Sequence, residues 1–385
     1  MAEYKHVETA LIHGGIYGDS HTGAVNTPIF LTSTYKQDAL GQDRGYEYSR
    51  TGNPTREALE ALIAELENGY AGFAFASGMA AITAVFSLFS AGDRVLISSN
   101  VYGGTFRVLD KVFRRFGIGY DIVASDRIEA FEAALTNDVR AILIESPANP
   151  LLTVVDIRAL AEVAKRNNTL LIVDNTFMTP YFQRPIELGA DIALHSATKY
   201  LGGHSDVIAG LVVVNTPELA DRLHFIQNAT GGIQQPFDSF LLIRSIKTLG
   251  VRMERHAENA EKIALYLQSH PAVKRLFYPG LPTAEGYEIH RAQATSGGAI
   301  VTFELDEGRD VAKFFTGLRL IDLAESLGGV ESLVCHPASM THASIPIDIR
   351  EKVGITDALV RLSVGIEHVD DLIEDIAAAI DASSG

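Results

Sequence analysis

A lysine directly after a predicted strand is the clearest chemical feature of this sequence. Lys199 ends the run Ser196-Ala197-Thr198-Lys199, which follows the apolar segment 191–195. The carboxyl ends of strands form the ligand crevice of sheets covered by helices, and partial desolvation there lowers the pKa of a lysine, making it a nucleophile for a carbonyl. An isolated lysine after a strand is more often an ordinary surface residue, so the assignment depends on its neighbours.

Hydroxyl residues beside Lys199, and a glycine-containing turn earlier in the sequence, could bind a phosphate. Ser196 and Thr198 alternate in direction with Lys199, so their hydroxyls could hold a phosphate while the amine meets an aldehyde. The segment 77–79 (Ser-Gly-Met) begins a predicted helix, and free N–H groups at a helix N-terminus bind anions, although such turns are common. Neither GxGxxG nor GxxxxGK[ST] occurs, which argues against a nicotinamide dehydrogenase.

An acid and an aromatic residue complete the set. Asp174 ends the apolar run 170–173, and an aspartate at such a strand tip can keep the ring nitrogen of pyridoxal phosphate protonated. A helix cap or a Mg²⁺ ligand is an equal alternative for this residue alone. Tyr102, in a glycine-containing loop, could stack on a planar cofactor and exchange protons, or simply pack in the loop. No metal-ligand spacing occurs among the histidines, so we expect no metal.

The elements that must position these residues alternate between short apolar runs and helical patterns. Asn53-Pro54 begins a helix with an N-cap and a proline at its first position. Helical patterns at 128–136 and 157–167 lie between predicted strands, and this rhythm indicates an α/β fold with a mostly parallel sheet flanked by helices. The strands are predicted at 94–98, 120–123, 141–145, 170–174, 191–195 and 211–214.

The chain divides into three predicted parts. Residues 1–47 show weak periodicity and resemble an extended arm. Residues 48–243 form the large domain, and one long helical stretch at 239–269 leads out of it. Residues 244–385 form a smaller α+β domain, whose predicted elements are strands at 274–277, 299–305 and 359–364 and a final helix at 370–381.

Composition excludes several classes of protein. The net charge of −16 disfavours nucleic acid as a partner, and 47% hydrophobic residues suit a globular core. The uncharged segment 68–92 is long enough to cross a bilayer, but a turn at Ser77-Gly78 would expose backbone groups to lipid, so we predict a strand, a turn and a buried helix. The single cysteine, Cys335, and the lack of an apolar leader favour the cytoplasm.

Together these pieces resemble the Cys/Met-metabolism family of pyridoxal-phosphate (PLP) enzymes over nearly the whole chain. The most specific segment is 195–204 (His-Ser-Ala-Thr-Lys-Tyr-Leu-Gly-Gly-His). The resemblance implies the PLP-dependent transferase fold of the aspartate aminotransferase type (fold type I), with PLP as cofactor. Other matching segments are 46–56, 77–79, 101–105, 174–177, 325–329, 340–343 and 360–363.

The resemblance also assigns cofactor contacts. It makes Lys199 the Schiff-base lysine and catalytic base, Asp174 the partner of the ring nitrogen, and Tyr102 the ring-stacking and proton-exchanging residue. Tyr48 and Arg50 would reach the phosphate from a neighbouring subunit, which implies active dimers assembled into a homotetramer. The remaining implied phosphate contacts are Gly78 and Met79, through backbone N–H groups, Ser196 and Thr198.

Further positions are implied to bind a sulfur amino acid. Arg361, which lies in an apolar strand, would bind the α-carboxylate with Ser326 and Asn149 nearby, and a carboxylate ligand would explain a charge that is otherwise costly to bury. Gly104 stands where methionine γ-lyases typically carry a cysteine, and Phe106 departs from the animal γ-lyase pattern. Glu47 and Glu325 match the carboxylates that γ-lyases and γ-synthases place near the distal amino group of cystathionine. Arg107 and Thr341 match the γ-lyase pattern.

The resemblance to bacterial cystathionine γ-lyases implies γ-elimination of L-cystathionine to L-cysteine, 2-oxobutyrate and ammonia. Desulfhydration of homocysteine or cysteine, with release of H₂S, is an accompanying expectation. The alternative is a cystathionine γ-synthase, an O-acylhomoserine thiol transferase, which captures the same intermediate with a thiol instead of releasing it. β-Lyases carry aromatic residues near position 325, and this chain has none there.

Overall fold

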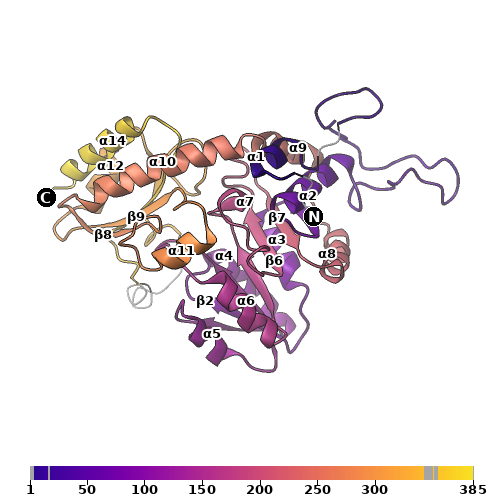
Figure 1. Cartoon of the computed structure of the whole chain (residues 1–385), viewed down its shortest axis with the longest axis horizontal. Helices are drawn as coiled ribbons and strands as arrows, with labels where there is room; N and C mark the ends of the chain where they lie inside the picture. The colour runs from indigo at the N-terminus through magenta and orange to yellow at the C-terminus, as the bar shows by residue number, and fades with distance from the viewer. Residues whose placement is uncertain (1–3, 16–17, 342–349, 351–353, 385) are drawn as a thin grey trace.

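A seven-stranded sheet forms the centre of the larger part of the protein (Figure 1). The structure, a computed structural model, describes residues 4–15, 18–341, 350 and 354–384. The strand order is β1-β7-β6-β5-β4-β2-β3; β3, β2, β4, β5 and β6 run parallel, whereas β7 is antiparallel to both neighbours. The predicted mostly parallel sheet is therefore confirmed. Its strands are β1 (Ala71–Phe75), β2 (Arg94–Ser98), β3 (Gly119–Val123), β4 (Val139–Glu145), β5 (Leu170–Asp174), β6 (Ile192–Ser196) and β7 (Gly210–Val214).

Helices cover both faces of this sheet, as β7 illustrates. Leu211 and Val213 pack in the core that contains α2 and α9, whereas Val212 and Val214 pack in the core that contains α3 and α8. Alternate residues of a strand point to opposite faces, so a strand covered on both sides is apolar throughout. The helices are α2 (Pro54–Leu66), α3 (Gly78–Phe86), α4 (Gly103–Lys111), η1 (Phe113–Phe116), α5 (Ile128–Ala134), α6 (Ile157–Arg166), α7 (Thr179–Phe182), α8 (Pro217–Thr230) and α9 (Pro236–Ile246).

The uncharged segment 68–92 folds as predicted, into a strand, a turn and a helix. It contains β1 and α3, and the Ser77 side chain caps α3 by accepting a hydrogen bond from Ala80 N at 3.0 Å. Across the described parts of the chain, no helix has the length and apolarity needed to cross a bilayer.

A five-stranded sheet lies in the smaller part of the protein. Its order is β10-β11-β12-β9-β8, and β12 is antiparallel to both β9 and β11. The short strands β10 and β11 escaped the sequence analysis because they span only two and three residues. The elements here are β8 (Val273–Phe277), α11 (Tyr287–Gln293), β9 (Ile300–Leu305), α12 (Val311–Gly317), β10 (Asp322–Leu323), β11 (Leu333–Cys335), β12 (Leu359–Ser363) and α14 (Val369–Ala382).

Two helices, not one, connect the two sheets. The prediction of one continuous helix at 239–269 is wrong, because α9 ends at Ile246 and α10 (Leu249–Gln268) begins after a break. Thr248 has φ −109° and ψ 10°, outside the α-helical region, which interrupts the helix. The proposed domain boundary after residue 243 falls inside α9 and stays a prediction.

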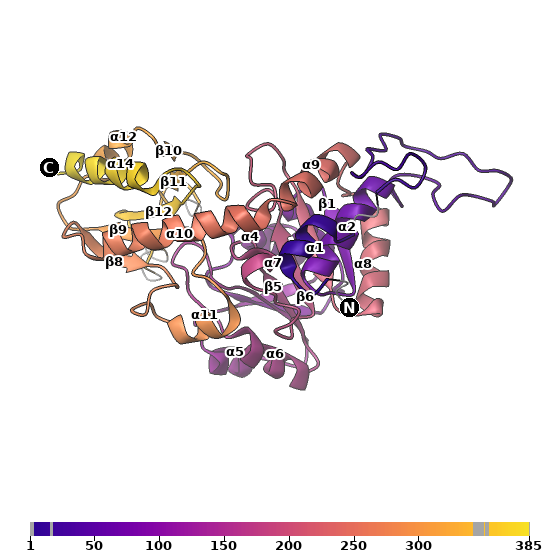
Figure 2. The same ribbon diagram turned by 45° about the horizontal axis from the view of Figure 1, so that its top comes forward.

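The N-terminal segment is only partly an extended arm. Helix α1 (Val7–His13) buries Ala10 and Leu11 against the body, so the prediction of an arm is wrong for these residues. From residue 18 to residue 47 the chain has no regular helix or strand and projects away from the body (Figures 1 and 2). Val25 is 90% exposed and Leu40 fully exposed in this arm. Apolar side chains as exposed as these on a projecting segment are compatible with contact with another protein surface.

Candidate active site

A cavity of about 290 Å³ lies at the carboxyl ends of β4, β5 and β6. This is the edge at which parallel sheets covered by helices bind ligands. Residues 325–327 and Arg361, from the part of the chain that carries the smaller sheet, close the opposite wall. Twelve residues predicted from the sequence line this cavity: Gly78, Met79, Tyr102, Asn149, Asp174, Ser196, Thr198, Lys199, Glu325, Ser326, Thr341 and Arg361.

Lys199 lies three residues beyond the end of β6 and points into this cavity. Its Nζ donates a hydrogen bond of 2.6 Å to Ser326 Oγ. Burial, together with the positive charge of Arg361, lowers the pKa of Lys199 from 10.5 to about 8, and the carboxylate of Glu325 opposes this shift. A large fraction of this amine is therefore neutral and nucleophilic near pH 8, as the sequence analysis expected.

The lowered pKa predicts how cofactor attachment depends on pH. The rate of PLP attachment to the cofactor-free protein should rise with pH as Lys199 loses its proton, and should level off above about pH 8. At pH 8 an ordinary lysine is neutral in only roughly 0.3% of molecules. Stopped-flow absorbance between pH 6 and pH 10 measures the rate, and an acetylated lysine amide reacting with PLP under the same conditions serves as the control. A protein rate that rises in parallel with that control up to pH 10 would contradict the assignment.

Asp174, at the end of β5, lies in the floor of the cavity. Its Oδ1 accepts hydrogen bonds from Thr176 N at 3.0 Å and Thr176 Oγ1 at 2.5 Å. Thr176 Oγ1 in turn accepts from Ser196 N at 2.8 Å, so Thr176 ties the ends of β5 and β6 together. Burial raises the pKa of Asp174, and the hydrogen bonds from Thr176 oppose that rise. A cationic group bound beside this carboxylate would compensate its buried charge.

Glu145 is a second carboxyl group in the cavity, it is only 7% exposed, and it was not among the residues predicted from the sequence. It ends β4 beside Asp174 in the sheet register, lines the cavity, and accepts a hydrogen bond from Tyr102 N. Burial raises its pKa, and the charge of Asp174 raises it further. The signal was present, since apolar residues 141–144 followed by a carboxylate repeat the pattern that identified Asp174. Glu145 links the cavity floor to the loop that carries Tyr102.

The turn before α3 lies next to Ser196. A Cβ atom at Gly78 would lie 3.1 Å from Ser196 Oγ, so glycine permits this close approach. The N–H groups in the first turn of α3 have no partner within the helix, which makes this corner suited to an anion. Thr198 Oγ1 donates to Ala209 O at 3.2 Å and accepts from Ala209 N at 3.1 Å. Phosphate binding by these residues stays a prediction.

Tyr102 lines the cavity, and the position of its ring requires a glycine at position 104. A Cβ atom at Gly104 would lie 2.4 Å from Cε1 of the Tyr102 ring and 2.7 Å from Met79 Sδ. Any side chain at this position would displace the ring or the thioether. Gly104, where methionine γ-lyases typically carry a cysteine, therefore leaves the space that the Tyr102 ring and the Met79 thioether occupy.

Arg361, on β12, is only 3% exposed and spans the two parts of the protein. One terminal nitrogen donates to Asn149 Oδ1 at 2.9 Å, and the other donates to the main-chain oxygen of Ser326 at 2.8 Å. Its Nε is buried and lacks a hydrogen-bond partner among the residues that the structure describes. A guanidinium held in this way at a cavity wall is suited to a carboxylate ligand.

Four predicted residues lie outside the cavity of their own chain: Glu47, Tyr48, Arg50 and Arg107. Glu47 accepts a hydrogen bond from Gln37 at 3.4 Å, and Arg50 donates to Asn228 O at 2.6 Å. Tyr48 is 47% exposed, and Arg107 is exposed on α4. For Tyr48 and Arg50 this position agrees with the expectation that they serve a neighbouring subunit. The roles of all four stay predictions.

The cavity residues fit PLP group by group. Lys199 offers an amine to an aldehyde, Asp174 offers a partly buried carboxylate to a protonated ring nitrogen, and the α3 N-terminus beside Ser196 offers an anion site. The buried, unpaired Nε belongs to Arg361, which remains available for a carboxylate of the substrate. One cavity thus contains an amine, a carboxylate, an anion site and a guanidinium, which are the groups that PLP and an amino-acid substrate require.

Known proteins resemble the chain along nearly its whole length. Residues 8–381 match the model of the family described as "Cys/Met metabolism PLP-dependent enzyme". The chain is 56% identical to a cystathionine gamma-lyase of Bacillus subtilis (strain 168), over 97% of this chain and 99% of that protein. It is 55% identical to a cystathionine beta-lyase of Lactococcus lactis subsp. cremoris, with the same coverage. A crystal structure of cystathionine gamma-lyase from Lactobacillus plantarum complexed with L-serine matches with a TM-score of 0.96 at 52% identity, covering 98% of this chain and 99% of that one.

Proposed function

Because this chain belongs to the Cys/Met metabolism family of PLP-dependent enzymes, we propose that it catalyses the γ-elimination of L-cystathionine. Membership makes it a PLP-dependent carbon–sulfur lyase of fold type I, as predicted from the sequence. The choice of the γ-carbon bond, and desulfhydration of homocysteine and cysteine as accompanying activities, are the finer part of the proposal. We place the enzyme in the cytoplasm, in keeping with its single cysteine.

The shared position of three charged side chains carries this proposal. Arg361 and Glu325 both line the cavity with Lys199. The charge of Arg361 lowers the pKa of Lys199, and the charge of Glu325 raises it. An amino acid with an α-carboxylate and a second, distal ammonium group matches a cationic anchor and an anionic anchor in one cavity. Cystathionine has both groups and a carbon–sulfur bond between them.

Each cavity residue then has a task that follows from its position. When bound, PLP withdraws electrons from the substrate and acidifies its C–H bonds. Lys199 takes the proton from Cα and carries protons within the cavity, for which a pKa of about 8 is well suited. Arg361 holds the α-carboxylate, and Asp174 keeps the ring nitrogen of the cofactor protonated.

The departing sulfur needs a proton as its bond to Cγ breaks. Tyr102 and Lys199 are the two cavity residues that we propose for this step. Glu325 would hold the distal ammonium group, so that the cysteine half of the substrate leaves as one molecule. The balance is cystathionine plus water giving cysteine, 2-oxobutyrate and ammonia.

Identification of products tests the proposal. The purified enzyme is offered L-cystathionine alone, and separately an O-acylhomoserine with cysteine. We expect cysteine and 2-oxobutyrate from the first reaction. Pyruvate and homocysteine as products would instead mean β-elimination, which is the activity in the name of the Lactococcus relative. That result would contradict the assignment of γ-elimination. Efficient formation of cystathionine in the second reaction would favour the γ-synthase alternative.

We also propose that the active site is shared between subunits. Tyr48 and Arg50 lie outside the cavity of their own chain, and the exposed apolar arm at 18–47 precedes them. Both observations support a dimer in which each chain supplies these two residues to the phosphate of its partner. Two such dimers would form the homotetramer.

A further inference from the structure

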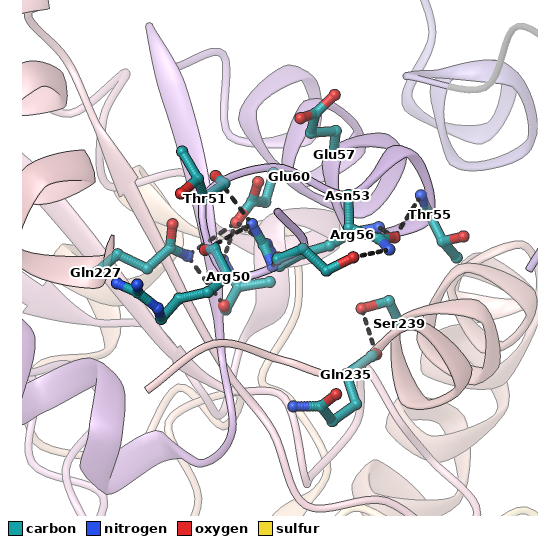
Figure 3. Close-up of polar contacts among 12 residues, drawn as sticks. Arg50, Thr51, Asn53, Thr55, Arg56, Glu57, Glu60, Gln227, Gln235 and Ser239 are labelled. Carbon is teal, nitrogen blue, oxygen red and sulfur yellow. Dashed lines mark hydrogen bonds and ion pairs between the residues drawn. The ribbon is translucent and has the colours of Figure 1, made fainter. Parts of the chain in front are cut away.

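A buried arginine holds the segment that carries Tyr48 and Arg50 (Figure 3). Arg56, on the first turn of α2, is 1% exposed. One terminal nitrogen donates to Ser49 O at 2.7 Å, and the other donates to Arg50 O at 3.3 Å and Thr51 O at 3.2 Å. Three consecutive carbonyl groups thus converge on one guanidinium, which fixes the path of the main chain at this point.

The same arginine is tied to the body of its own subunit through Glu60. Arg56 Nε lies 3.5 Å from Glu60 Oε1. That oxygen also accepts a hydrogen bond from Gln227 Nε2, in α8, at 2.9 Å (Figure 3). It accepts another from Ala74 N, in β1, at 2.9 Å. Arg56 Nε makes no hydrogen bond among the described residues, so the nearby Glu60 carboxylate acts through its charge, which offsets the cost of burying the guanidinium beside the sheet.

The side chains adjacent to this anchor point away from it. Ser49 is buried, whereas Tyr48 on one side is 47% exposed and Arg50 on the other is exposed. The Arg50 guanidinium lies 5.4 Å from the centre of the Tyr48 ring, so the two form one outward-facing pair. Arg56 binds only the main chain of this segment and contacts neither side chain by a hydrogen bond; the Arg50 side chain donates to Asn228 O, in α8, at 2.6 Å.

We propose that Arg56 is a positioning residue for the active site of the neighbouring subunit. By holding the carbonyl groups of residues 49–51, its guanidinium presents Tyr48 and Arg50 to the phosphate bound by the partner. This inference rests on the shared site of the proposed function, but it does not depend on which carbon–sulfur bond the enzyme cleaves. A lysine would keep the charge and lose the planar fork that binds several carbonyl groups at once.

The first measurement is the PLP affinity of Arg56→Lys. We expect its Kd for PLP to rise about tenfold or more, since hydrogen bonds to charged groups are among the stronger ones. The matched control is Arg309→Lys, which removes a guanidinium bound to the Ile380 carbonyl at 2.8 Å outside the cavity and should leave the Kd unchanged. An unchanged Kd in Arg56→Lys overturns the proposal.

Mixed assemblies then show on which subunit Arg56 acts. Arg56→Lys chains are coexpressed with Lys199→Ala chains, and assemblies that contain both are isolated with two tags. Only sites with Lys199 give the visible absorbance of attached PLP, and in a mixed dimer that site belongs to the Arg56→Lys chain. If Arg56 acts on the partner, the titration should show a phase of wild-type affinity. The Lys199→Ala chain has an intact Arg56 and supplies Tyr48 and Arg50 to the site that is observed. Action within its own chain predicts only weak binding, and that result overturns the proposal.

A milder variant keeps the test informative if Arg56→Lys does not fold. Glu60→Gln retains an oxygen acceptor for Ala74 N and Gln227 while removing the charge that anchors Arg56. It should weaken PLP binding in the same direction, and mixed assemblies with Lys199→Ala should again show the phase of wild-type affinity. These tests measure cofactor binding, whereas the proposed cystathionine reaction is tested by the products of the wild-type enzyme. A failure of one proposal can therefore be distinguished from a failure of the other.

Discussion

Replacing Lys199 with alanine is expected to reduce turnover by more than about 10³-fold and to remove the visible absorbance of attached PLP. The substitution removes the amine that we propose both attaches the cofactor and moves protons, and no second lysine lines the cavity formed by the described residues. Absorbance spectra and product assays measure the two effects. The matched control is Lys165→Ala, which changes an exposed lysine on α6 and should leave both unaltered. A visible band that survives in Lys199→Ala would show that another group holds the cofactor.

Replacing Asp174 with asparagine is expected to lower kcat by about 10²–10⁴-fold, with a smaller change in KM. The amide oxygen can still accept the bonds from Thr176, so the cavity floor should keep its shape. The negative charge that we propose faces the ring nitrogen of bound PLP is lost, so the ring should withdraw electrons less strongly. Steady-state kinetics on cystathionine, with PLP saturation confirmed by absorbance, separates this effect from loss of cofactor.

A matched carboxylate provides the control for that experiment. Asp191, just before β6, lies outside the cavity and accepts a hydrogen bond from Leu171 N at 2.8 Å. Asp191→Asn should therefore alter stability more than kcat. If Asp174→Asn keeps the kcat of the wild-type enzyme, then the ring nitrogen does not depend on this carboxylate.

Local patterns predicted much of the fold and the centre of the site. Lys199 and Asp174 each follow a short apolar run, and strand tips in a parallel sheet meet at one edge, so their proximity followed from the sequence. The same rule would have found Glu145. By contrast, the break at Thr248 depends on the backbone angles of a single residue, and α1 is stabilised by packing against the body, which no pattern of seven residues reveals.

Contacts between distant segments were beyond local patterns. Asn149 and Arg361 lie 212 positions apart and meet because the two sheets pack around one cavity, so only the family resemblance identified the pair. The anchoring role of Arg56 had no signal of its own, since an arginine on the first turn of a helix is usually exposed and solvated. Its three carbonyl acceptors became apparent only with the backbone path of residues 49–51.

The backbone at Ser326 limits how this enzyme can be redesigned. Ser326 has φ +91°, in a region that side chains rarely adopt, while its hydroxyl accepts from Lys199 and its carbonyl accepts from Arg361. A mutant library aimed at new substrates would naturally randomise this position because it faces the reacting groups. Large or β-branched replacements would place backbone strain next to Arg361, the proposed anchor for the substrate carboxylate. A loss of activity in such variants would then be misread as poor substrate fit. A library restricted to glycine, asparagine and serine at 326, with full diversity at 325, would separate the two effects.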